Sequence, residues 1–122
     1  FIYNNGGEIF FLDDLDDSLI LNEFRKIINS STANNSKVYC SFDVDSMQSS
    51  FSPGVSAPAG FGLTANDFVR MAYCAGMSEN TLLMDFAEFN PNFDFDGKTA
   101  KTCAVAIHSA ISGFARRQRK SR

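Results

Sequence analysis

The chain has 122 residues, of which 44% are hydrophobic, 13% aromatic and 20% charged, and its formal net charge is −3 at pH 7. These proportions are typical of a globular domain and exclude a low-complexity or disordered chain. No stretch approaches the ~20 consecutive apolar residues that a membrane span needs. A cytoplasmic protein with neither a membrane nor a nucleic-acid partner is therefore expected.

The cysteines and the basic end of the chain indicate no separate function. Cys40, Cys74 and Cys103 are far apart and lack the spacing of a zinc site, so reduced core thiols are expected. The basic tail at 116–122, "RRQRKSR", is interpreted as a solvated helix end. The sequence opens at Phe1 without an initiator methionine, which suggests that it belongs to a longer chain.

In chain order, the first half of the sequence predicts a strand, a helix and a second strand. The apolar run "IFFL" at 9–12 predicts a buried strand. Apolar residues at helical spacing predict an amphipathic helix over 17–30, with aspartates at its start. The segment 38–43, "VYCSFD", predicts the second strand, and 46–64 is expected to be a long loop.

The second half continues the alternation of helices and strands. Thr64 and Asp67 form a capping box for a helix at 65–76, whose glycine marks the expected C-terminal end. A third strand is predicted at 81–88 and a last helix at 99–116. Alternation of this kind predicts parallel strands joined by helical crossovers in a three-layer α/β sandwich. Three strands are too few for a sheet covered on both faces, so residues 1–122 are expected to be the C-terminal part of a single domain.

Two aspartates stand where the most apolar strand ends. Residues two apart in a strand project from the same face, so Asp43 and Asp45 converge if the extended conformation continues through Val44. Open α/β sheets bind ligands at the carboxyl ends of their strands. Neighbouring carboxylates repel unless a cation lies between them, and a hard divalent ion such as manganese or magnesium suits oxygen ligands. The alternative is a solvated strand end, in which Asp45 accepts backbone N–H groups of the following turn.

A longer set of motifs is more specific than this pair. "SFDVD", "PGVSAP", "GLT" and "MDFAEFNPNFDFDGKTA" follow one another between residues 38 and 106 in an order and spacing that resemble the ureohydrolases, the arginase, agmatinase and formiminoglutamase family. The resemblance implies a mainly parallel, arginase-like α/β sheet, two manganese ions per active site and metal-assisted hydrolysis of a C–N bond. By the same resemblance, Asp43 is a catalytic ligand that bridges both ions and Asp45 binds one of them.

Two further acids match family positions. Glu88, in "EFNP", corresponds to the glutamate that binds the amidine or guanidine group of the substrate and takes part in catalysis. A carboxylate suits a planar cation because it accepts two parallel N–H bonds. Asp85, in "MDFAE", lies three residues earlier and would face the opposite side of an ideal strand, so we expect it to support the site from behind the metal ligands and substrate. Without the motif, Glu88 would be an ordinary exposed strand-end residue.

The motif details favour the formiminoglutamase-like branch. Many relatives have Asp-Pro where this chain has Gln48-Ser49, and Thr-Gly-Thr where it has residues 55–57, "VSA". These departures weaken an arginase assignment more than they weaken the metal site. The expected reaction is hydrolysis of N-formimino-L-glutamate to L-glutamate and formamide, an activity of histidine metabolism. An arginase, an agmatinase and a catalytically inactive relative with a structural or regulatory role remain alternatives.

The family takes its remaining metal ligands from histidine- and aspartate-containing motifs that lie further upstream, and none occurs in this sequence. Its single histidine, His108, has apolar neighbours at helical spacing and is interpreted as a packed or boundary residue. The expected partners are therefore the rest of the protein's own N-terminal chain, a small-molecule substrate and further copies in a homo-oligomer.

Overall fold

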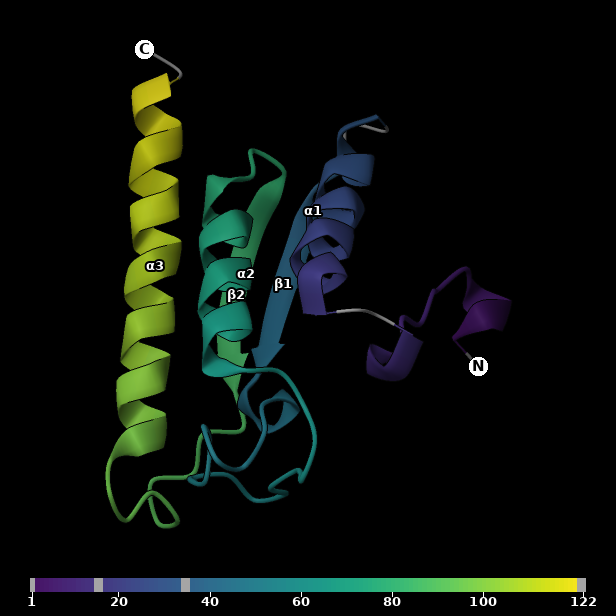
Figure 1. Cartoon of the computed structure of the whole chain (residues 1–122). Helices are drawn as coiled ribbons and strands as arrows, with labels where there is room; N and C mark the ends of the chain where they lie inside the picture. Colours follow the sequence, from purple (N-terminus) through teal and green to yellow (C-terminus); the bar gives the residue numbers. More distant parts are fainter. Residues whose placement is uncertain (1, 15–16, 34–35, 121–122) are drawn as a thin grey trace.

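The computed structural model describes residues 2–14, 17–33 and 36–120 (Figure 1). These residues form three α-helices, two β-strands and three short 3₁₀ helices. In chain order they are η1 (Tyr3–Asn5), η2 (Leu12–Asp14), α1 (Asp17–Ala33), β1 (Val38–Asp43), η3 (Val44–Ser46), α2 (Ala65–Met77), β2 (Thr81–Ala87) and α3 (Lys98–Lys120). The predicted helices and the second and third predicted strands are confirmed.

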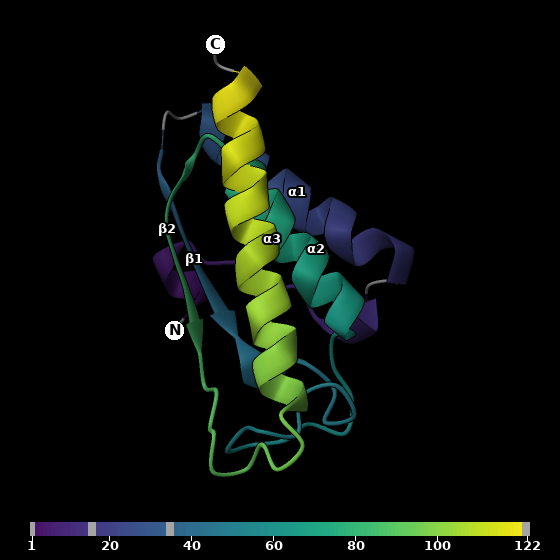
Figure 2. The ribbon, with the colours of Figure 1, turned by 90° about the vertical axis from the view of Figure 1, so that its left-hand side faces the viewer.

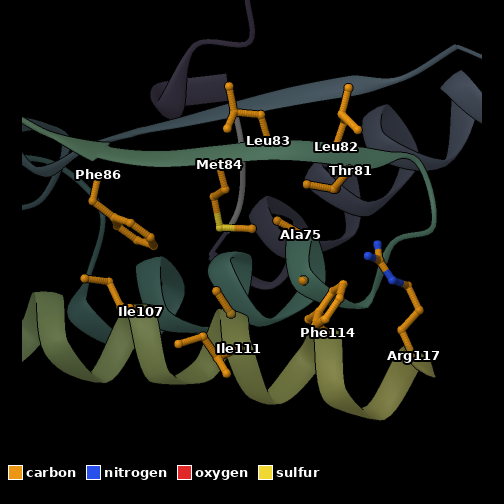
Figure 3. A pocket seen from close by; sticks show the side chains of 12 residues that line it. Ala75, Thr81, Leu82, Leu83, Met84, Phe86, Ile107, Ile111, Phe114 and Arg117 are labelled. Carbon is orange, nitrogen blue, oxygen red and sulfur yellow. The ribbon is translucent and has the colours of Figure 1, made fainter. Parts of the chain in front are cut away.

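The two strands pair in parallel and are joined by α2, as the alternating pattern predicts. Val38 pairs with Thr81, but the next pair is Tyr39 with Leu83, so Leu82 is an extra residue on β2. As a result of this extra residue, the adjacent side chains of Leu82 and Leu83 both point away from α3 (Figure 3). Beyond this irregularity the register is regular up to the pair of Asp43 with Ala87.

All three helices lie on one face of the sheet (Figure 2). The core on that face centres on Phe42 of β1, which stacks on Phe86 of β2 with ring centroids 5.2 Å apart. The rings of Phe24 from α1 and Phe68 from α2 lie 6.0 and 5.5 Å from the ring of Phe42. The opposite face carries Tyr39 and other exposed residues, and the described part of the chain places no α-helix over it.

Helix α2 begins as its capping box predicts and ends later than expected. Thr64 is the N-cap residue, and its hydroxyl accepts the N–H of Asp67 at 3.2 Å. Gly76 lies at the C-terminal end of the helix as predicted, and α2 continues for one further residue, to Met77. Gly76 lies against α3, where an added Cβ would stand 2.1 Å from the carbonyl oxygen of Ala110. Glycine is needed at position 76 because it has no side chain and lets α2 and α3 pack closely. It does not serve a left-handed turn there.

The strand predicted at 9–12 is wrong. Residues 7–11 have no regular secondary structure, and Leu12 begins η2. The segment lies beyond α1, apart from both strands (Figure 1), so it has no neighbouring strand to complete its backbone hydrogen bonds. Its apolar side chains are consequently exposed, and Phe11 retains 58% of its accessible surface.

The last helix, α3, extends past its predicted end at residue 116 and includes the basic residues up to Lys120. Arg116 donates to the hydroxyl of Tyr73 at 3.1 Å, and Arg117 donates to the carbonyl oxygen of Ser78. These contacts fasten the last turns of α3 to the C-terminal end of α2. No helix in the described ranges is both long and apolar enough to cross a membrane.

Candidate active site

Asp43 and Asp45 lie together at the carboxyl end of β1, but a turn rather than an extended strand joins them. Val44 begins η3, so the expectation that the strand continues through it is wrong. Asp43 is the N-cap residue of η3, and its Oδ1 accepts the N–H of Asp45 at 2.8 Å. The hydroxyl of Ser46 donates to the carbonyl oxygen of Asp43 at 2.6 Å and closes the turn. The carboxylates are therefore held in proximity by local capping.

The carboxylate of Asp45 is suited to a cation. Its Oδ1 is buried and has no hydrogen-bond partner. Burial raises the pKa of Asp45, and the negative charge of Asp43 raises it further, while the backbone N–H of Ala57 acts in the opposite direction. A buried carboxylate oxygen without a partner is costly. A divalent cation beside Asp43 and Asp45 would satisfy this oxygen and neutralise the repulsion, so the two residues fit a metal site.

These two carboxylates do not make a complete metal centre. The described residues contain no group of three or more histidine, cysteine, aspartate or glutamate side chains placed to hold an ion. The prediction that His108 is a packed or boundary residue is wrong, because its side chain is exposed on α3. The three cysteines are free thiols, with Cys40 and Cys103 buried and Cys74 partly buried.

Glu88 follows the last residue of β2 and has an unusual backbone. Its φ of 68° lies in the left-handed region, which residues other than glycine seldom adopt. Ladder pairing puts Asp43 opposite Ala87, so Glu88 leaves the same edge of the sheet as the two aspartates. Its side chain is exposed. A non-glycine residue in this conformation is common at functional sites, where the surrounding structure holds it in place.

The loop after Glu88 is fastened to the "PGVSAP" loop. Phe89 forms an antiparallel bridge with Val55, and the N–H of Asn90 donates to the carbonyl oxygen of Gly54 at 2.9 Å. The side-chain amide of Asn90 donates to the Ser56 hydroxyl at 3.2 Å. Two motifs that are more than thirty residues apart in the sequence therefore form one surface at the carboxyl edge of the sheet.

Asp94 fixes the other side of this surface. Its two carboxylate oxygens accept the N–H groups of Thr99 and Ala100 at 3.0 and 2.8 Å, at the start of α3. The Thr99 hydroxyl in turn accepts the N–H of Gly54 at 2.7 Å. Sequence reasoning did not identify this role of Asp94, although an aspartate shortly before a helix is a usual capping signal.

Asp85 hydrogen-bonds to two side chains in the middle of β1, Tyr39 and Ser41. The hydroxyl of Ser41 donates to its Oδ1 at 2.8 Å, and the hydroxyl of Tyr39 donates to its Oδ2. These bonds lower the pKa of Asp85, and the bond to Asp85 raises the pKa of Tyr39. Sequence reasoning missed Tyr39 and Ser41. The available signal was their spacing of two, which puts them on the same strand face as Asp43.

Three cavities lie beside these elements. One, of about 440 Å³, has Asp45 on its wall together with apolar side chains that include Phe10, Phe24 and Phe61. The second, of about 400 Å³, is an apolar groove between β2 and α3 (Figure 3), with Met84, Phe86, Ile111 and Phe114 among its lining residues. The third, of about 410 Å³, has Asp43 among its lining residues, so the first and the third cavities adjoin the aspartate pair.

Comparison with known proteins identifies the family. A profile of the arginase family matches residues 1–113. A formimidoylglutamase from Aliivibrio fischeri is 31% identical over 114 residues, which covers 87% of this chain and 32% of that protein. A formimidoylglutamase from Rhodococcus opacus is 37% identical over 75 residues, covering 62% of this chain and 23% of that protein.

Solved structures agree with the sequence relatives. A Trypanosoma cruzi formiminoglutamase with Mn²⁺ has a TM-score of 0.80 and 27% identity, covering 94% of this chain and 38% of that one. The arginase from Bacillus caldovelox has a TM-score of 0.78 and 26% identity, covering 92% of this chain and 37% of that one. The chain thus spans about a quarter to two fifths of the length of these proteins. It has the parallel α/β arrangement of the arginase-like three-layer fold, as a part of that fold, and it belongs to the arginase family.

Proposed function

We propose that the protein containing this chain is a manganese-dependent formimidoylglutamase, which hydrolyses N-formimino-L-glutamate to L-glutamate and formamide. The observation that carries the proposal is the buried, unpartnered Oδ1 of Asp45 beside Asp43, at the same sheet edge as Glu88. Formimidoylglutamases recur among the relatives, and the related Trypanosoma cruzi enzyme was crystallised with Mn²⁺. Metal-site carboxylates and a substrate-binding carboxylate are what hydrolysis of a cationic amidine requires.

In this proposal each acid has a separate task. Asp43 and Asp45 hold the ions, and the turn at Val44 keeps their carboxylates at a fixed separation. When bound, manganese ions supply a water of lowered pKa and a Lewis acid for the C=N carbon. Glu88 accepts two N–H bonds from the planar formimino group and orients its carbon toward the metal side of the site.

The remaining metal ligands are proposed to come from the part of the protein that the relatives possess beyond the matched region. Two carboxylates are too few to complete the coordination of even one divalent ion. The expected partner of this chain is accordingly the rest of its own arginase-type domain, and small-molecule substrate binds where the two parts meet.

A guanidine substrate is the second candidate. The favouring observation is the likeness to the Bacillus caldovelox arginase, whose TM-score is close to that of the formiminoglutamase. A carboxylate at Glu88 suits a guanidinium as well as a formimino group, because both are planar cations with parallel N–H donors. The two substrates differ in what lies beyond this group, so direct assay separates them.

The test is to purify the complete protein, load it with Mn²⁺ and assay N-formimino-L-glutamate, L-arginine and agmatine side by side. We expect release of formamide from the first, with kcat/KM at least tenfold higher than for the other two. Preferred urea release from arginine or agmatine would assign the protein to a different ureohydrolase activity. No hydrolysis of any of the three, in a folded and metal-loaded protein, would support an inactive relative.

A further inference from the structure

The register of β2 against β1 determines where Glu88 lies, and two features bear on it: the stack of Phe86 on Phe42 in the core and a polar contact on the opposite face of the sheet. Leu82 is the extra residue at the irregularity, and the exposed fractions of Leu82 and Leu83 are 76% and 59%. Both side chains point away from α3 (Figure 3). Burial of these two leucines therefore does not favour either pairing of Tyr39, and the apolar preference for the observed register comes from Phe86, which stacks on Phe42 further along the ladder.

A polar contact immediately after the irregularity also distinguishes the registers. Two hydroxyls on β1, from Tyr39 and Ser41, donate to the two different carboxylate oxygens of Asp85 on β2. Ser41 and Asp85 are direct partners in the ladder. Moving β2 by one residue would turn Asp85 to the opposite face of the sheet, because side chains alternate, and would break both hydrogen bonds.

We propose that Asp85 is a positioning residue, which together with Tyr39 and Ser41 locks β2 in register and thereby places Glu88 relative to Asp43. We call these three residues the register clamp. The inference rests on the proposed function and deepens it. A slip of one residue would move Glu88 by about 3.3 Å along the sheet edge. Misplacement of a reacting group by even ~1 Å costs on the order of a hundredfold in rate.

The clamp acts on Glu88 and spares the aspartate pair. Asp43 is the last residue of β1 and Asp45 lies two residues later, and both are held by their own turn, in which the N–H of Asp45 donates to Oδ1 of Asp43 at 2.8 Å. Loss of the clamp should therefore leave metal binding intact while it misaligns the substrate. This separation distinguishes a positioning role from a general contribution to stability.

The experiment uses the complete protein with the double substitution Tyr39→Phe and Ser41→Ala, which removes both donors and leaves the Asp85 carboxylate. We expect kcat/KM for N-formimino-L-glutamate to fall at least tenfold, with kcat lowered and KM raised, at unchanged manganese content. Ser41→Thr keeps one hydroxyl and should restore most of the activity that Ser41→Ala loses. Tyr3→Phe and Glu79→Gln, at exposed positions outside the ladder, are matched controls that should keep wild-type kinetics.

A second measurement separates failure of the clamp from failure of the proposed function. Amide hydrogen exchange of residues 83–87 reports the ladder directly, whether or not the wild-type protein turns over any substrate. The double variant should exchange these amides at least tenfold faster than the wild type, and the two controls should not. Unchanged exchange would overturn the clamp. Wild-type kcat and KM in a variant whose ladder has loosened would overturn its link to Glu88.

Discussion

At the end of β1, the backbone turn places two carboxylates within reach of one cation. The Asp43 carboxylate caps the turn and accepts the N–H of Asp45, while Oδ1 of Asp45 is buried, so the site is partly ordered before any ion binds. Such preorganisation reduces the entropy that ligand ordering would otherwise cost. The charge repulsion that results is the expected property of a site made for a cation.

Replacement of Glu88 separates substrate binding from metal binding. Glu88→Gln in the complete protein keeps shape and length but loses the charge-assisted contact, which is worth about 1.5–3 kcal/mol. This corresponds to a fall in kcat/KM of roughly 10- to 150-fold, with manganese content unchanged. Steady-state kinetics and elemental analysis make the comparison. Wild-type kcat/KM in this variant would remove Glu88 from the active site.

Glu88→Gly provides a structural control for the same position. Glycine adopts a φ of 68° without strain, so this variant should be more stable than Glu88→Gln in thermal unfolding while remaining as impaired in turnover. A less stable Gly variant would show that the glutamate side chain itself supports the fold.

The phenol of Tyr39 reports the integrity of the register clamp. The bond to Asp85 raises the pKa of Tyr39 above its ordinary value of 10.0, and the hydroxyl donors lower the pKa of Asp85 below its ordinary value of 3.8. A raised phenol pKa adds stability that is fully present below about pH 10 and is lost as pH rises through the folded-state pKa. A lowered carboxyl pKa adds stability that is present above about pH 4 and is lost as pH falls.

These directions predict how the phenol titrates. Asp85→Asn should lower the pKa of Tyr39 toward the ordinary tyrosine value, because the negative acceptor is gone. Carbon-13 NMR of ring-labelled tyrosine follows the titration, and Tyr39→Phe assigns the signal. The same phenol pKa in wild type and Asp85→Asn would mean that the two side chains do not interact in solution.

Among the elements, the contact of α2 with α3 depends on two glycines. A Cβ at Gly76 would lie 2.1 Å from the carbonyl oxygen of Ala110, and one at Gly113 would lie 2.4 Å from that of Tyr73. Backbone atoms cannot move aside as a flexible side chain can. The helices therefore approach more closely than alanine at either position allows.

Gly76→Ala should destabilise the protein despite the better helix propensity of alanine. The propensity gain is about 1 kcal/mol, whereas forcing two backbones apart costs about 1–3 kcal/mol and disturbs the wall of the groove beside β2. Thermal or urea unfolding of the complete protein measures the balance. Gly60→Ala is the matched control, since no atom lies within 4 Å of its added Cβ. A more stable Gly76→Ala variant would show that the helices separate readily.

Local signals explain which elements could be predicted from the sequence. Helical spacing and the Thr64 cap identify the helices, and alternation with helices identifies β1 and β2. The apolar run at 9–12 has the composition of a strand, but a strand also needs a neighbour, and local sequence does not report one. The register clamp could not be predicted for the same reason, because Ser41 and Asp85 are 44 residues apart in the sequence and meet only through the pairing of the two strands.

The candidate site was predicted in position and partly misjudged in geometry. The motifs indicate that Asp43, Asp45 and Glu88 belong to one site, and the structure places all three at one edge of the sheet. The expected extended backbone at Val44 is wrong because capping by Asp43 favours a tight turn there. The sequence pattern contains no direct signal for the left-handed conformation of Glu88, which stands next to the bridge between Val55 and Phe89.

For the molecule as a whole, large apolar surfaces remain uncovered. Leu82 and Leu83 are exposed on one side of β2, and Ile111 and Phe114 retain 60% and 48% of their surface on the other side, in the groove against α3. Contiguous exposed apolar surface marks a place where another element packs. The chain matches only 32% and 38% of the length of two relatives. We therefore expect further strands and helices of the same domain to cover these surfaces.

The 122 residues expressed alone should be inactive and should associate. Added manganese should not restore turnover, since the chain supplies only part of each ion's ligands, and uncovered strand edges favour self-association. Light scattering and the three-substrate assay check both outcomes. Co-expression with the remaining part of the domain should yield a dispersed, active complex. Strong manganese-dependent turnover by the 122 residues alone would show that the site is complete within them.

An anomalous difference map of the complete, manganese-loaded protein, collected at the manganese absorption edge, tests whether Asp43 and Asp45 bind the metal. We predict two peaks at the carboxyl edge of the sheet, with Asp43 in contact with both and Asp45 in contact with one. The Asp43→Asn variant should lose both peaks and the activity together. Peaks located elsewhere, or full manganese occupancy in Asp43→Asn, would contradict the assignment of these carboxylates as metal ligands.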